Sequence, residues 1–128
     1  MALKSSMRTE RSRVNYLGSA KSGTKHLWAM RVTSVALLVL AIAFVIIMLS
    51  LVGKDYNAVR TELSSPLPAI LLLLFILTGV YHMMIGMQVI IEDYVHGTHL
   101  REWALIANIC FSAFVGLSCV YAVLKINF

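Results

Sequence analysis

The chain has 128 residues, of which 59% are hydrophobic and 13% are charged, and its formal net charge is +5. Soluble domains carry about 25% charged residues, and a soluble chain of this length could not bury so much apolar surface in its own core. The composition therefore excludes an ordinary soluble domain. It predicts one domain that resides in a membrane.

Three long apolar runs carry this prediction. Residues 32–52 and 103–124 contain no charged side chain, and residues 67–91 contain one ionisable group, His82. A spanning helix needs roughly 20 apolar residues. The runs lack the two-residue alternation of barrel strands. Short connections join them, so we expect an all-α membrane protein with three transmembrane helices in an up-down-up bundle.

The basic residues predict how the bundle is oriented. Residues 1–31 hold seven of the eleven Lys and Arg residues and one acid, Glu10. Basic residues concentrate on the cytoplasmic side of membrane proteins. A cytoplasmic N-terminus places these seven and Arg101 inside, which makes eight of eleven. We therefore expect a basic cytoplasmic segment (1–31), a three-helix transmembrane domain (32–128) and no nucleic-acid partner. The Arg- and Ser-rich N-terminus also fits a mitochondrial transit peptide, which is the less favoured alternative.

His82 is the candidate site residue inside a span, where an ionisable side chain is costly and needs a reason. It shares one helical stripe with small residues, Gly79 and Gly86 among them, and with Asp93. Small residues allow close helix packing, but they also leave room for a flat macrocycle. His82 is therefore either a neutral histidine bonded to a neighbouring helix or an axial haem ligand.

A second group of polar residues lies at the cytoplasmic end of the same helix. Asp93 follows His82 by eleven residues, which is about 16 Å along a helix, and Tyr94 is next to it. Acids and tyrosines are common at helix ends and membrane interfaces. In a redox protein, however, the hydroxyl of Tyr94 could donate a hydrogen bond to a carbonyl of the substrate, and Asp93 could hold or relay a proton.

Two further features are Arg31, just before the first predicted span, and the small residues of the third span. Arg31 stands beside Trp28, where it is either a snorkelling arginine or a clamp on a carboxylate. The third run contains small residues such as Ser112 and Gly116. They suit close packing against other helices, and we expect the chain to need partner subunits for stability.

The stretch His82-Met83-Met84-Ile85-Gly86, followed by Asp93-Tyr94, resembles the hydrophobic membrane anchor subunits of succinate dehydrogenase, respiratory complex II. His26, Trp28 and Arg31-Val32-Thr33 look like the N-terminal part of the alphaproteobacterial members. The resemblance extends from Gly18 to the C-terminus and leaves the first seventeen residues outside.

The resemblance implies a function for each candidate residue. Two small anchor subunits bind one haem b between them, and each gives one histidine, here His82 with Gly86 beside it. Ubiquinone binds near the iron–sulfur subunit, where Tyr94 matches the tyrosine that bonds the quinone and Asp93 the neighbouring acid. Arg31 matches an arginine near the haem propionates and the quinone.

The resemblance also implies partners and a location. The partners are a second anchor subunit of the cytochrome b556 type, an iron–sulfur subunit and a flavoprotein subunit that oxidises succinate. The complex lies in the bacterial cytoplasmic membrane. The isolated chain is not expected to be an enzyme, because nothing in it resembles a flavin, iron–sulfur or dicarboxylate site.

The positions of the other histidines bear on the second haem ligand, and two other functions are compatible with a small helical membrane protein. His26, His96 and His99 fall outside the predicted spans, so the second haem ligand is expected from another chain. A small transporter would usually need an acid in the middle of the membrane, and none is present. A structural or assembly factor without a cofactor is the other alternative.

Overall fold

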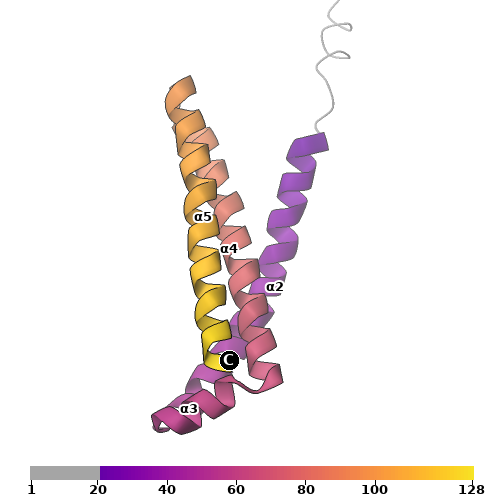
Figure 1. Cartoon of the computed structure of the whole chain (residues 1–128). Coiled ribbons are helices and arrows are strands. Elements are labelled where there is room, and N and C mark those ends of the chain that lie inside the picture. Colours follow the sequence, from indigo (N-terminus) through magenta and orange to yellow (C-terminus); the bar gives the residue numbers. More distant parts are fainter. Residues whose placement is uncertain (1–20) are drawn as a thin grey trace, which may run out of the picture.

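The computed structural model describes residues 21–128, with side chains from Gly23 onward. Within that range it contains four helices and no strand: α2 (Lys21–Leu51), α3 (Tyr56–Leu63), α4 (Pro66–Tyr94) and α5 (Thr98–Asn127). The long helices α2, α4 and α5 run up, down and up as antiparallel neighbours (Figure 1). All three are long and apolar enough to cross a membrane. The predicted all-α architecture with three spans is therefore confirmed.

The boundaries of the helices follow from local chemistry. Ser65 is extended and Pro66 opens α4, where the missing N–H of proline leaves no bond unmade. Helix α4 ends at Tyr94, within three residues of the predicted end at 91, and α5 begins directly after Gly97. Helices α4 and α5 therefore continue beyond the apolar runs at both ends, whereas α2 ends at Leu51, one residue before the end of its run.

Helix α2 differs most from its predicted span, because it begins at Lys21 rather than near residue 32. Lys and Arg are good helix formers, so charge limits how far a helix enters lipid but does not stop the helix. At 1.5 Å per residue its 31 residues extend about 46 Å, which exceeds the roughly 30 Å hydrocarbon layer. Residues 21–31, predicted as part of the basic segment, are therefore helical and continuous with the first span.

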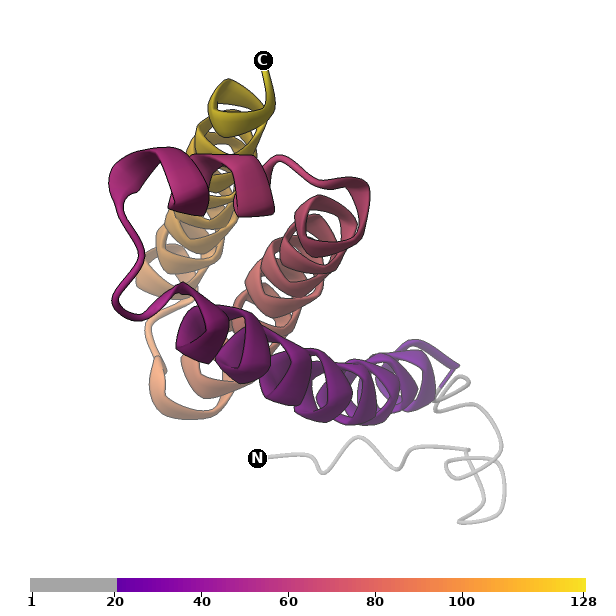
Figure 2. The ribbon, with the colours of Figure 1, turned by 90° about the horizontal axis from the view of Figure 1, so that it is seen from below.

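The connection between the first two spans contains a short helix, α3, that the sequence did not predict. Gly53 has a φ of +79°, a conformation that costs glycine little, and it turns the chain out of α2. Glu62 of α3 forms an ion pair with Lys54 and lies 2.6 Å from Ser50 Oγ. These two bonds hold the pKa of Glu62 below its usual range. They fasten α3 across the end of the bundle, beside the end of α5 (Figure 2).

Helix α4 is the central element and packs against both α2 and α5. On the α2 side, the rings of Phe44 and Phe75 stack with centroids 4.8 Å apart. On the α5 side, Gly116 is buried so closely that an added Cβ would lie 3.3 Å from Val80 Cγ1. Ser112, one turn before Gly116, is only 1% exposed. The small-residue seam is therefore packed, but against α4 of the same chain.

Most large apolar side chains face outward. Phe114 and Leu117 on α5 are each 72% exposed, and Leu38 on α2 is 66% exposed. Such a surface would be unfavourable in water and is normal against lipid or against the helices of another membrane subunit. Together with the three apolar helices, it identifies the chain as a multi-pass membrane protein.

The bundle is not parallel along its whole length. Helices α2 and α4 approach each other near the middle and diverge toward the end that carries Lys21, Tyr94 and Thr98 (Figures 1 and 2). Helix α3 and the C-terminus lie at the opposite end. The candidate site residues lie in the middle and in the diverging half.

Candidate functional site

His82 lies where α2 and α4 meet. Its side chain is half-buried, and its Nδ1 is 2.8 Å from the hydroxyl oxygen of Thr33 on α2. Among residues 21–128 no hydrogen-bond partner is found for Nε2. The two ring nitrogens of an imidazole point in divergent directions. One nitrogen is therefore fixed by α2 while the other is left available.

The two glycines of the predicted stripe have different surroundings. A Cβ at Gly79 would lie 3.7 Å from Leu37 of α2, which is ordinary packing contact, whereas a Cβ at Gly86 would meet nothing within 4 Å. Gly86 lies one helical turn beyond His82. Gly79 thus serves the contact between α2 and α4, and open space adjoins the helix at Gly86.

His26 is closer to the site than its place outside the predicted spans indicated. It lies within α2, half-buried, and its Nε2 is 3.3 Å from the backbone carbonyl oxygen of Ile85, three residues beyond His82. An imidazole N–H can donate to that oxygen. The early start of α2 brings this ring to α4, which corrects the expectation that His26 lies outside the spans.

Arg31 is not brought to His82 within this chain. It is exposed and shares one side of α2 with Trp28 and Val35, whereas Thr33 faces α4. Positions two apart on a helix lie on nearly opposite sides. No ion pair of Arg31 is found within residues 21–128. Its guanidinium is therefore available to an external carboxylate on the outer side of α2.

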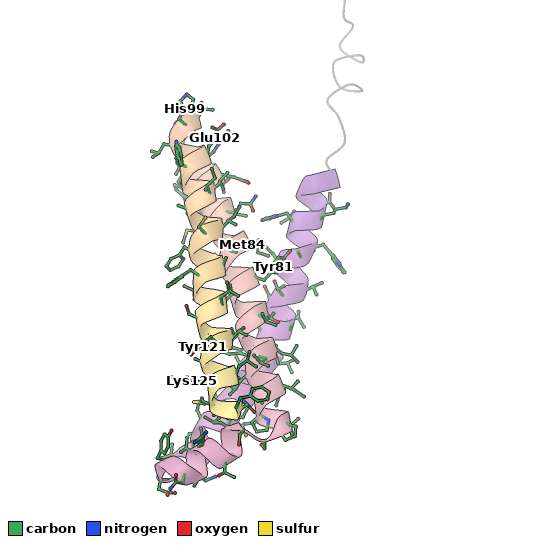
Figure 3. All side chains as sticks on the ribbon, viewed as in Figure 1. Tyr81, Met84, His99, Glu102, Tyr121 and Lys125 are labelled. Carbon is green, nitrogen blue, oxygen red and sulfur yellow. The ribbon has the colours of Figure 1, made fainter. Side chains whose placement is uncertain are left out.

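Asp93 and Tyr94 lie in the last turn of α4 and are exposed, Tyr94 by 77%. In the described part of the chain, neither the Asp93 carboxylate nor the Tyr94 hydroxyl has a hydrogen-bond partner. The backbone carbonyl of Tyr94 is 2.9 Å from His96 Nδ1. Figure 3 shows His99 and Glu102 at this same end of the bundle and Lys125 at the other. The two side chains are thus presented outward, where a ligand or partner could meet them.

Sequence reasoning missed three features near the site. Thr33 drew attention only through the family resemblance, yet its hydroxyl is hydrogen-bonded to His82. Asn108, a carboxamide within an otherwise apolar run, is buried and donates to the Met84 carbonyl oxygen at 2.9 Å. Its isolation in that run was a signal that could have found it. The third is an apolar hollow of about 350 Å³ between α4 and α5, lined by Met83, Met87, Ile91, Ala104, Ala107, Asn108 and Phe111.

The arrangement around His82 suits a planar, iron-centred group better than a bare metal ion. No cluster of three metal-binding side chains occurs in residues 21–128. A single imidazole nitrogen without a partner in the described chain, one helical turn from a glycine that has open space beside it, is a donor that could hold a haem through its iron. A haem fits these residues, provided that its second axial ligand is supplied from elsewhere.

Comparison with known proteins identifies the family of the chain. The chain matches the family described as succinate dehydrogenase/fumarate reductase transmembrane subunit over residues 5–121. It is 35% identical to the succinate dehydrogenase hydrophobic membrane anchor subunit of Paracoccus denitrificans over 119 residues, 93% of this chain and 92% of the relative. It is also 35% identical to the subunit of the same name from Rickettsia bellii, over 91% of this chain and 93% of the relative.

The match covers nearly the whole chain, with all of α2 and α4 and with α5 as far as residue 121. The resemblance drawn from His82, Asp93 and Tyr94 is therefore confirmed at the level of the family. The chain belongs to the transmembrane subunits of the succinate dehydrogenase and fumarate reductase family, and within it to the hydrophobic membrane anchor subunits of succinate dehydrogenase.

Proposed function

We propose that this anchor subunit binds haem b through His82 Nε2 and forms part of a ubiquinone-reduction site at Asp93 and Tyr94. The observation that carries the haem proposal is the difference between the two nitrogens of the His82 ring. Its Nδ1 is bonded to Thr33, its Nε2 has no partner in the described chain, and open space adjoins Gly86. A histidine that served only helix packing would not need that open space.

Bound haem b supplies reversible one-electron chemistry at iron. His82 would be one protein ligand of the iron, and a histidine of the second anchor subunit would be the other. His26 is a poor choice for that second ligand, because its Nε2 faces the Ile85 carbonyl. Arg31 would bind a propionate, and this role requires the carboxylate to reach the outer side of α2. Loss of haem retention in Arg31→Gln would support that role, and unchanged retention would remove it.

The quinone proposal rests on where Asp93 and Tyr94 lie. Ubiquinone has an apolar tail suited to lipid and a polar head that needs hydrogen bonds, and its reduction takes up two protons. The end of α4 meets these needs, because its hydroxyl and carboxylate are exposed and unpaired in residues 21–128. Tyr94 would donate to a quinone carbonyl, and Asp93 would hold or deliver a proton.

The proposed orientation puts this end of the bundle in the cytoplasm of a bacterium, with the complex in the inner membrane. The excess of basic residues in the N-terminal segment supports it. The iron–sulfur and flavoprotein subunits would dock on the same side. An alkaline phosphatase fused to Phe128 should be active outside the membrane. An active cytoplasmic reporter at that position would reverse the orientation.

The haem proposal is tested with His82→Ala in the assembled complex. We expect the pyridine haemochrome and the reduced-minus-oxidised spectrum to show loss or altered ligation of haem b. His96→Ala, which changes an exposed histidine just beyond α4, is the matched control and should keep the wild-type spectrum. An unchanged spectrum and midpoint potential in His82→Ala would refute the assignment. Absence of haem from the purified wild-type complex would leave the chain an anchor subunit and would refute the haem proposal.

A further inference from the structure

Thr33 has three oxygen- or nitrogen-bearing neighbours and one hydroxyl hydrogen to share among them. Its Oγ1 lies 2.8 Å from the Ala29 carbonyl oxygen, 3.1 Å from the Met30 carbonyl oxygen and 2.8 Å from His82 Nδ1. The two carbonyl oxygens can only accept. A threonine in a helix commonly gives its hydrogen to the carbonyl four residues earlier. Oγ1 then presents lone pairs to His82.

The hydrogen position on Thr33 determines the state of the histidine. If Oγ1 faces His82 with lone pairs, Nδ1 must carry the ring hydrogen and donate it to Oγ1. A neutral imidazole has one N–H, so Nε2 is then bare and able to bind iron. If Thr33 donated to Nδ1 instead, Nε2 would carry the hydrogen and could not bind a metal.

We propose that Thr33 is a positioning residue that holds His82 in the tautomer with hydrogen on Nδ1 and aims Nε2 out of the α2–α4 contact. This proposal rests on the proposed haem ligation by His82. Histidines that bind metals usually donate their other N–H to an acceptor, which fixes the ring and raises its basicity. Here the acceptor is a hydroxyl on a different helix, so the crossing of α2 and α4 is itself part of the ligand geometry.

The test uses the complete succinate dehydrogenase complex with Thr33→Val, which keeps the shape of the side chain and removes the hydroxyl. Thr33→Ser restores the hydroxyl. Ser34→Ala is the matched control, because Ser34 also donates to the Met30 carbonyl, at 2.7 Å, but is exposed and not bonded to His82. Haem content, the electron paramagnetic resonance spectrum of ferric haem and the midpoint potential are measured in each variant.

We expect Thr33→Val to hold haem about ten- to a hundred-fold more weakly and to raise its midpoint potential. Without an acceptor at Nδ1 the imidazole is a poorer electron donor, which destabilises ferric iron. Thr33→Ser and Ser34→Ala should resemble the wild type. Wild-type haem binding and potential in Thr33→Val would overturn the proposal, as would a defect that Thr33→Ser does not rescue.

The result is separable from the haem assignment itself. If His82→Ala keeps its haem spectrum, the ligand assignment fails whatever Thr33→Val does. If His82→Ala loses the spectrum and Thr33→Val does not change it, the ligand assignment stands and only the role of Thr33 is wrong.

Discussion

Tyr94→Phe is the variant that separates a quinone-binding tyrosine from one that only anchors α4 at the membrane surface. The change keeps the ring and removes the hydroxyl. That hydroxyl has no partner within residues 21–128, and the side chain is 77% exposed. The loss should therefore cost the folded chain almost nothing. Any defect then reports on a ligand or on another subunit.

The size of the defect follows from the bond that is lost. Leaving one polar partner unsatisfied in a closed site costs about 1–3 kcal/mol, and 1.36 kcal/mol corresponds to roughly tenfold in rate. We expect succinate-to-quinone activity to fall about tenfold or more. Succinate oxidation with a soluble artificial acceptor should persist, because it does not use the quinone site.

The assay compares both activities in membranes with equal amounts of assembled complex. Tyr121→Phe is the matched control, since Tyr121 is a 65% exposed tyrosine near the opposite end of the bundle (Figure 3). It should retain both activities. Wild-type quinone reduction in Tyr94→Phe would show that Tyr94 is an interfacial anchor. Loss of both activities at equal amounts of complex would point to a defect outside the quinone site and would contradict the proposed role of Tyr94.

Two further predictions concern how the bundle is held together. Gly116→Val should destabilise the α4–α5 contact by about 1–3 kcal/mol through overpacking, because even a Cβ at this position would lie 3.3 Å from Val80. The loss of stability is measured by thermal unfolding of the purified complex. Gly23→Val, where nothing lies within 4 Å, is its control, and equal thermal stability of the two variants would contradict the packing argument. The bonds from Lys54 and Ser50 depress the pKa of Glu62, so their stabilisation is complete above the ordinary carboxyl pKa of 4.5 and is lost as the pH falls through the lower folded value. The protection of α3 amides against hydrogen exchange, measured relative to the rate of an unstructured peptide at the same pH, should therefore fall in acid in the wild type, whereas Glu62→Gln should show the weaker protection already at neutral pH and no further step in acid.

The sequence predicted the helical class, the number of spans and their approximate positions. In lipid, a helix is the simplest structure that hydrogen-bonds every backbone N–H and C=O group over 20 residues. An apolar run such as 103–124 therefore has few alternatives to a helix. The sequence also singled out His82, since an ionisable residue within a span is unusual. These features depend on the residue and its near neighbours, and a pattern along the chain is sufficient to detect them.

The sequence could not predict which face of each helix meets which neighbour. Helix α2 starts at Lys21 rather than near residue 32. The hydropathy of a run predicts which residues lie in lipid, but it does not predict where the helix that contains them begins. That extension brings His26 to Ile85, and the crossing of α2 and α4 places Thr33 at His82. The same rotation places Arg31, the expected partner of a carboxylate, on the side of α2 that faces away from His82.

What the sequence determined by itself was therefore membrane residence, three helices and a family. The tertiary structure alone decided the surroundings of the candidate ligand. In a helix with apolar residues on every side, periodicity does not mark a preferred face. Side-chain shape then sets the rotation of each helix, through contacts such as Leu37 against Gly79 and Val80 against Gly116. Those contacts join residues that are distant in the sequence, and they fix one nitrogen of His82 while leaving the other available.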